Sequence, residues 1–348
     1  MHERPGVYSA YDASSVLSGA QGTKGIGVAA KAAGGTANEP VLLHSLAEGL
    51  AAFGADEAES PGMETLLRLL FAGGAASVVA VVVNGTDYAS AFAVLAERED
   101  VKVTVCDSGE EGVQQALRSS VEAASAQRRE RIAVVGGSGL NVTQLVERAA
   151  ALNSERMVLV GGDVVTEAGT ALSGVFGAAA VAAAIAVQSD PSIPIQGAVL
   201  AGLGGVSVRY GDSEIDTLVR GGVTPLEAVG GEVSPVRGVT TRTTTGGAAD
   251  ATWRELTTVL IVDDVIPTIR SSLRSRFARS KNTAQSRGAI RSQVVLELEN
   301  KRAQERIESY GEVSVRAMDG EPTVCLVEFS FAVAHGLSRI YLTAHITV

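Results

Sequence analysis

Residues 131–162 read RIAVVGGSGLNVTQLVERAAALNSERMVLVGG, and their pattern is that of an α/β fold. It begins and ends with an apolar run, RIAVVGG and RMVLVGG, each as long as a buried strand. Between the two runs, residues 141–152 carry apolar side chains at helical spacing, which predicts an amphipathic helix. A strand, a helix and a second strand in this order predict two parallel strands joined by a helical crossover.

The same alternation extends in both directions, from about residue 25 to residue 239. Further strands are predicted at KGIGVAAKA, ASVVAVVV and VKVTVCD, and further helices at SLAEGLAAFG, METLLRLLFAGG, residues 88–98 and residues 111–129. Val-rich strands separated by amphipathic helices indicate a largely parallel sheet covered on both faces. We therefore predict an α/β domain over residues 23–239.

Near Thr240 the character of the sequence changes. Residues 252–282 predict a helix that is interrupted or restarted near Pro267, and residues 289–311 predict a second helix that ends at Gly311. Residues 312–318 and 323–333 are two strand-like runs around the turn DGEP, which predicts a hairpin. We predict an α+β domain over residues 240–337.

Both ends of the chain are predicted to be extended. Residues 1–22, the N-terminal arm, contain Gly and Ser and lack a helical period. Residues 338–348, the C-terminal arm, read SRIYLTAHITV, in which apolar and polar side chains alternate as in a strand. A terminal strand leaves an edge that invites pairing, so this one either completes its own sheet or joins that of a neighbour.

Composition narrows the class of protein. The 348 residues carry a formal net charge of −10, which argues against nucleic-acid binding by the chain as a whole. The two cysteines, Cys106 and Cys325, lie far apart and predict neither a disulfide framework nor a metal cluster, as expected for a reducing cytoplasm. The first residues lack the pattern of a signal peptide. Residues 169–188 are uncharged, but their Ala and Gly content and acidic flanks favour a buried helix over a membrane span.

Tests for catalytic chemistry give a weak result. Gly136, Gly137 and Gly139 lie between a strand and a helix and could hold an anion, but the third glycine of a dinucleotide fingerprint is replaced by Val142. The sequence has no P-loop and no nucleophile elbow, and only four histidines. The adjacent carboxylates of residues 263 and 264 point about 100° apart on a helix, so helix N-cap or surface roles are expected. An enzyme that binds a nucleotide-like ligand at residues 136–141 stays as the alternative interpretation.

A basic run is the strongest charged feature of the sequence. Between residues 270 and 291 there is no Asp or Glu, and apolar side chains at helical spacing leave the basic ones for the opposite, exposed face. A surface for an acidic partner is favoured over a merely solvated face, because a solvated helix usually mixes both signs. Nucleic acid is the lesser option, since aromatic side chains are lacking. The basic residues are Arg270, Arg274, Arg276, Arg279, Lys281, Arg287 and Arg291.

An ordered series of segments resembles contractile tail sheath proteins, which surround the tail tube of contractile phages, tailocins and related injection systems. The chain is short for that family, and its PGVY motif continues as SAYD instead of a more acidic and apolar sequence. The resemblance covers most of the chain, and the segments that carry it are ERPGVY at residues 3–8, residues 25–54, residues 66–83, residues 173–202 and residues 218–245.

The resemblance implies a structural function without enzymatic activity or cofactor. Each arm would add a strand to the C-terminal domain of a different neighbouring subunit, and the basic run would face an acidic surface of the tube protein. The α/β region would face outward, and the lattice would shorten and widen on triggering without nucleotide hydrolysis. The residues implied as subunit-linking are Val7, Tyr8, Tyr11, Ile340, Leu342, Ala344, Ile346 and Val348.

The resemblance also implies the partners and the location. The partners would be further copies of the chain in helically stacked hexameric rings, the tube protein, and baseplate and tail terminator proteins. Direct nucleic-acid contact and membrane insertion are not expected. The subunit would assemble in the bacterial cytoplasm and then form part of a virion tail or a tailocin particle.

Overall fold

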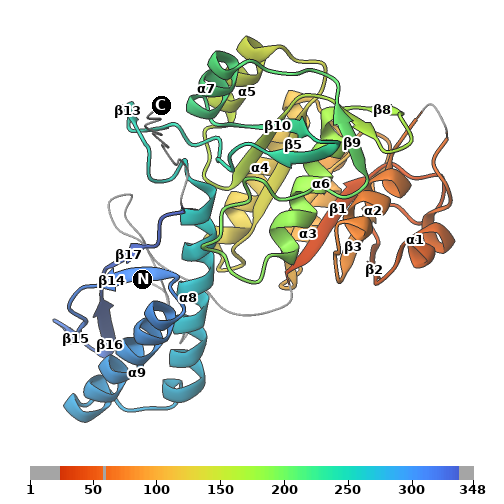
Figure 1. The fold of residues 1–348 in the computed structure, drawn as a ribbon. Helices are drawn as coiled ribbons and strands as arrows, with labels where there is room; N and C mark the ends of the chain where they lie inside the picture. Colours follow the sequence, from red (N-terminus) through yellow and green to blue (C-terminus); the bar gives the residue numbers. More distant parts are fainter. Residues whose placement is uncertain (1–23, 58–59, 337–348) are drawn as a thin grey trace, which may run out of the picture.

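A computed structural model describes residues 24–57 and 60–336, and its largest element is an eight-stranded sheet (Figure 1). The strand order is β11-β10-β6-β5-β4-β1-β3-β2, in which only the edge strands β11 and β2 are antiparallel to their neighbours. The predicted parallel sheet is confirmed. Its strands are β1 (Gly25–Ala30), β2 (Pro40–Leu43), β3 (Val78–Val82), β4 (Val101–Cys106), β5 (Ile132–Gly137), β6 (Met157–Gly161), β10 (Val223–Val229) and β11 (Glu232–Pro235).

Helices cover both faces of this sheet, as the sequence predicts. Side chains of one helix set share a core with one face, and those of a second set share a separate core with the other face. The first set contains α1 (Leu46–Phe53), α2 (Met63–Ala72) and α6 (Gly174–Val187). The second set contains α3 (Tyr88–Ala96), α4 (Glu111–Ala126), α5 (Val142–Leu152) and α7 (Asp212–Arg220).

Helix α6 is the apolar segment that the sequence predicts to be buried, and it crosses the centre of the domain. It starts at Gly174, because Ser173 caps it by accepting a hydrogen bond from the backbone N–H of Val175 at 3.4 Å. Its small side chains allow close packing: a Cβ atom at Gly73 would lie 2.5 Å from that of Ala183. Within the described residues, no helix combines the length and the apolar character that a membrane crossing requires.

Short strands with no clear sequence pattern complete the α/β domain and the segment that follows it. They form a small three-stranded sheet and a two-stranded hairpin in the segment that leads out of the domain. Because each has only two to four residues, no alternation is long enough to identify it. These strands are β7 (Val164–Thr166), β8 (Ala171–Leu172), β9 (Leu203–Val206), β12 (Thr244–Thr245) and β13 (Ala248–Ala249).

Two long helices follow, α8 (Leu256–Phe277) and α9 (Ala284–Ala303). The predicted interruption near Pro267 is wrong, because α8 is continuous and contains this proline. An interior proline costs about 3 kcal/mol, partly because it lacks the N–H group that would bond the carbonyl four residues earlier. Burial of its neighbours Val265 and Ile266 opposes this cost, since each buried aliphatic side chain contributes roughly 1.5–3 kcal/mol.

The predicted end of the second helix at Gly311 is also wrong. Helix α9 ends at Ala303, Glu305 takes a positive φ of 58°, and the chain turns into strand β14 (Ile307–Tyr310). Strand β14 pairs with β17 (Phe331–Val333), whereas β15 (Ser314–Met318) and β16 (Glu321–Glu328) form the predicted hairpin. The confirmed fold class is therefore α/β with a following α+β part.

Helix α8 lies between the two parts of the molecule and contributes to the core of each (Figure 1). Its Val259 and Leu260 belong to the core of the α/β domain, whereas Val265 and Ile269 pack with α9, β14 and β17. The core therefore changes from one part to the other along a single helix.

Candidate functional site

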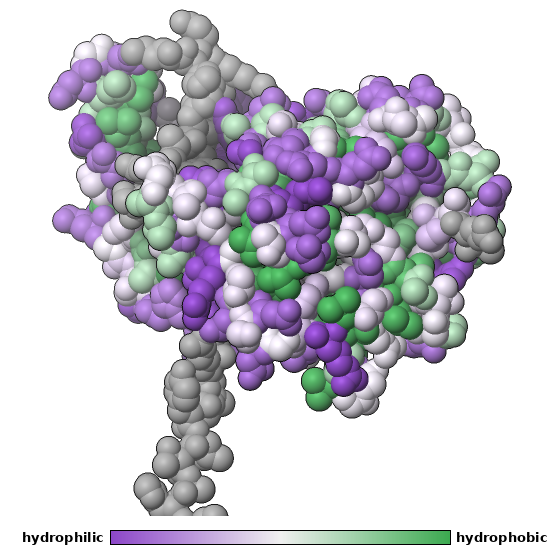
Figure 2. Space-filling model, turned by 90° about the horizontal axis from the view of Figure 1, so that it is seen from above, coloured by the Kyte–Doolittle hydropathy of each residue, from purple (hydrophilic) through white to green (hydrophobic). Residues whose placement is uncertain are grey.

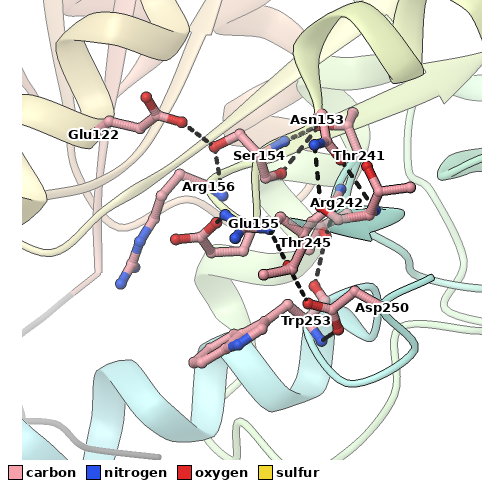
Figure 3. A network of polar contacts seen from close by, with 12 residues as sticks. Glu122, Asn153, Ser154, Glu155, Arg156, Thr241, Arg242, Thr245, Asp250 and Trp253 are labelled. Atoms are coloured by element: carbon pink, nitrogen blue, oxygen red, sulfur yellow. Dashed lines mark hydrogen bonds and ion pairs between the residues drawn. The ribbon is translucent and has the colours of Figure 1, made fainter. Parts of the chain in front are cut away.

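The segment that enters α8 is fixed to the α/β domain by a polar network (Figure 3). The buried Thr241 hydroxyl donates to the backbone carbonyl of Ser154 at 3.0 Å and accepts from its N–H group at 3.0 Å. The Asn153 side-chain oxygen accepts from the N–H groups of Thr243 and Thr244 at 3.1 and 3.2 Å. These bonds join residues about 90 positions apart in the sequence. They tie the segment to the turn between α5 and β6, so the segment cannot leave this turn without breaking them.

A second part of this network organises the loop before α8. Arg242 forms an ion pair with Glu155 at 2.7 Å, and the Thr245 hydroxyl donates to the Asp250 carboxylate at 2.6 Å (Figure 3). Asp250 also accepts from the N–H of Trp253 at 3.0 Å. Burial raises the pKa of Asp250, but these hydrogen bonds outweigh burial and lower the pKa below its ordinary value. The loop therefore depends on an ionised Asp250.

Ion pairs also connect α8 with the α/β domain on one side. Arg156, buried just before β6, pairs with Asp263, and Arg270 pairs with Glu130 at 2.7 Å. The Arg270 and Glu130 side chains are only 12% and 9% exposed. Removing one partner of such a buried pair strongly destabilises the fold, because the remaining charge is then buried without compensation.

The opposite side of α8 is connected to the C-terminal part. Asp264 accepts from Lys301 of α9 and from Arg306 before β14, both at 2.7 Å. Asp263 and Asp264 thus point apart, as their spacing predicts, but the expected N-cap or surface roles are wrong. Each carboxylate is instead the largely buried partner of cations from a different part of the molecule, which neighbouring sequence does not reveal.

A cavity of about 490 Å³ lies at this junction, beside the cluster of ion pairs. Lys102 lines it as the extra residue of a β-bulge, since Gly25 pairs with Val101 and the next residue with Val103. Burial lowers the pKa of Lys102 and raises that of Asp263, although Arg156 opposes the second shift. Charges of both signs line the cavity, among them the cations of Lys24 and Arg306 and the carboxylate of Glu130, so no single sign of charge is selected there.

The basic run divides into three environments. Arg270 differs from the expected exposed position, because it lies in the junction with Glu130. Arg287 donates to the side chain of Asn282 at 3.0 Å, and Arg291 donates to the carbonyl of Val313 at 2.8 Å. The remaining four are exposed at the end of α8 and in the following turn, and the structure gives none of them an ion pair within residues 24–57 and 60–336; we call them the basic tip, and they are Arg274, Arg276, Arg279 and Lys281.

Two family models match the sequence, and together they cover most of it. Residues 82–241 match the phage tail sheath protein central domain, and residues 248–347 match the phage tail sheath C-terminal domain. The chain belongs to the phage tail sheath family. The sheath resemblance found in the sequence is thereby confirmed, and the sheath protein is a structural subunit of a contractile assembly.

Solved sheath structures share the fold of this sheath protein. The sheath tail protein of Desulfitobacterium hafniense has a TM-score of 0.72 and 11% identity, over 94% of this chain and 100% of the other. The helical sheath of the anti-feeding prophage in its contracted state has a TM-score of 0.71 and 15% identity over 99% of both chains. The PVC sheath complex of an extracellular contractile injection system, also contracted, has a TM-score of 0.71 and 13% identity, over 100% and 99%. The comparison with curated proteins found no match.

The glycine loop of the sheath protein has a packing explanation. A Cβ atom at Gly136 would lie 2.2 Å from the backbone of Gly174, so α6 can approach β5 only if this residue is glycine. The Asp163 carboxylate accepts from the N–H of Gly174 at 2.7 Å and more weakly from that of Gly139 at 3.4 Å. Asp163 thus places a negative charge beside the loop, which disfavours an anionic ligand there, and neither the family nor the sheath relatives support the nucleotide-binding alternative.

The predicted subunit-linking residues lie outside the described part of the sheath protein, in residues 1–23 and 337–348. Within the described part, no group of His, Cys, Asp and Glu is arranged to hold a metal ion. Cys106 is buried and Cys325 partly buried, and both are free thiols.

Figure 2 shows one face of the molecule. Outside the grey atoms, its apolar side chains form several small areas among polar ones.

Proposed function

We propose that the chain polymerises around a tail tube by exchanging strands with neighbouring subunits, and that the polymer contracts to drive the tube into a target cell envelope. The observation that carries this proposal is the division of the C-terminal part into two small sheets, β14-β17 and β15-β16, each with two strands among the described residues. Two-stranded sheets are marginally stable on their own, so added strands would stabilise them. Residues 338–348 have the alternation of such a strand.

The arms would supply affinity and register by different groups. Main-chain hydrogen bonds give an added strand its affinity, and alternate apolar side chains set its register. In the C-terminal arm these alternate side chains are Ile340, Leu342, Ala344, Ile346 and Val348. The N-terminal arm would contribute Val7 and Tyr11 on one face of its strand and Tyr8 on the other.

The basic tip would bind an acidic surface of the tube protein. Its four cations project from one end of α8 and lack ion pairs within the described ranges, so they are available to an external partner. Arg287 and Arg291 would extend this surface along α9, although both also donate hydrogen bonds within the subunit. Arg270 would act from the junction by holding α8 in place.

The proposed assembly is a helical stack of hexameric rings that contacts baseplate and terminator proteins. The solved relatives support the helical stacking, the six-fold symmetry and the baseplate contact, since one is described as a helical sheath and another as a six-fold symmetrised anti-feeding prophage baseplate. The subunit would assemble in the bacterial cytoplasm and remain in the finished particle. It would use neither a cofactor nor direct contact with nucleic acid or membrane.

Electron microscopy of the purified chain tests strand exchange directly. The full-length protein at high concentration would be compared with a version that ends at Leu337. We expect hollow ribbed tubes from the full chain and none from the shortened one. Equal polymerisation by both versions would show that the C-terminal arm does not link subunits.

A further inference from the structure

The first described residue, Lys24, is bound to the end of a helix distant in sequence. Its ammonium group donates to the backbone carbonyl of Gln188 at 2.6 Å and lies 3.4 Å from that of Ile185. Both carbonyls belong to the end of α6, where carbonyl groups lack helical partners and carry partial negative charge. Lys24 stands between the N-terminal arm and β1, so this contact fixes the point from which the arm leaves.

The other end of the described chain meets the loop that follows α6. A Cβ atom at Gly336 would lie 2.1 Å from the Cγ atom of Pro194, so the backbone passes directly over this proline. Two residues earlier, the N–H of Ala334 donates to the carbonyl of Arg306 at 3.2 Å. Arg306 in turn reaches Asp190 of the same loop, with 3.8 Å between Nε and Oδ1. The described chain therefore also ends beside residues 188–195, at Gly336.

This loop is held firmly in the α/β domain. The Asp190 carboxylate accepts from the N–H and hydroxyl groups of Ser192 at 2.9 and 2.7 Å. Gln188 donates from its side chain to the carbonyl of Asp190 at 2.6 Å. Ile195 is 3% exposed and belongs to the domain core. Internal hydrogen bonds and a buried side chain therefore make the loop a fixed support.

We propose that residues 188–195 are a shared anchor for the two arms, and that Lys24 is the positioning residue that sets the exit of the N-terminal arm. The proposal rests on strand exchange as the proposed function and adds where both linking segments originate. A segment that leaves from a fixed point searches a smaller volume for its partner edge, which raises its effective concentration and lowers the ordering cost of binding. Lys24 then acts on subunit linkage without touching the neighbour.

Substitutions of Lys24 in the full-length chain test the anchor. Lys24→Met removes the ammonium and keeps the stem, Lys24→Arg keeps a cation, and Lys31→Met removes the same charge just beyond the other end of β1. The readouts are the lowest protein concentration that gives sedimentable tubes, the helical twist and rise in micrographs, and the melting temperature of the soluble subunit. We expect Lys24→Met to raise that concentration about tenfold, and Lys24→Arg and Lys31→Met to stay within about twofold.

Two further comparisons separate positioning from a loss of folding. Pro194→Gly removes the contact of the C-terminal exit without altering Lys24, and we expect it to raise the polymerisation concentration in the same direction. Leu218→Ala opens a cavity far from the loop, and a lower melting temperature alone should leave its tubes regular. The anchor is wrong if Lys24→Met polymerises like Lys31→Met, or if Lys24→Arg does not restore assembly. If the unchanged chain forms no tubes, the proposed function fails and the anchor with it.

Discussion

Removing the Asp263 carboxylate tests whether buried charges fix α8 to the α/β domain. The Arg156 and Asp263 side chains are only 2% and 16% exposed, so Asp263→Leu replaces the carboxylate beside a buried guanidinium with an apolar group. Loss of one partner from a buried ion pair costs roughly 3–5 kcal/mol, and we expect the free energy of unfolding to fall by about this amount. A second change, Arg156→Met, should recover most of the loss, because two apolar groups replace the pair.

Urea unfolding followed by the fluorescence of Trp253 suits this measurement. Trp253 is the only tryptophan of the chain and is 5% exposed in the segment that leads into α8. Arg316→Met is the matched control, since its ion pair with Glu328 is exposed and should contribute less than about 1 kcal/mol. A cost for Asp263→Leu no greater than that of the control would show that the buried ion pair does not fix α8 to the α/β domain. So would a double variant no more stable than the single one.

Three further predictions concern the tip, the glycine loop and the loop before α8. Changing Arg274, Arg276 and Arg279 together to glutamate should abolish assembly on an isolated tube at an unchanged melting temperature, and persisting decoration would contradict the tube-facing role. Gly136→Ala should cost at least about 1–3 kcal/mol in thermal unfolding through overpacking, while millimolar nucleotide should not raise the melting temperature of the unchanged protein. The pKa of Asp250 is lower in the folded protein than its ordinary value of 3.8, so ionised Asp250 stabilises the fold above pH 3.8. This stability is lost as the pH falls through the folded-state pKa, so the free energy of unfolding should depend less on acid pH in Asp250→Asn than in the unchanged protein.

Most of the α/β domain follows from local pattern. Val-rich runs such as that of β5 and the helical period of α5 are properties of neighbouring residues, so the strand-helix-strand order predicts the parallel sheet. The end of α9 and the continuity of α8 do not follow in this way. Pro267 predicts a break in α8 from local sequence alone. The cost of this proline is opposed by burial of α8 against two cores, and that burial involves residues far away in the sequence.

The candidate site was predictable in charge but not in contacts. The basic run is visible in the sequence, and four of its members form the exposed tip. The placement of Arg270 depends on Glu130, which lies 140 residues away in the sequence. The contact of Lys24 with Gln188 is not predictable for the same reason, since it spans 164 residues. A lone lysine before a strand gives no signal of the helix end that it binds.

Because α8 is one unbroken helix built into two cores, it acts as a lever arm. Its 22 residues span about 33 Å at 1.5 Å per residue. If the α/β domain turns by about 10° while the far end of α8 is held, the domain end is displaced sideways by about 6 Å over that length. In the proposed contraction, the length of α8 would therefore set how far a rotation of the α/β domain displaces one part of the subunit relative to the other.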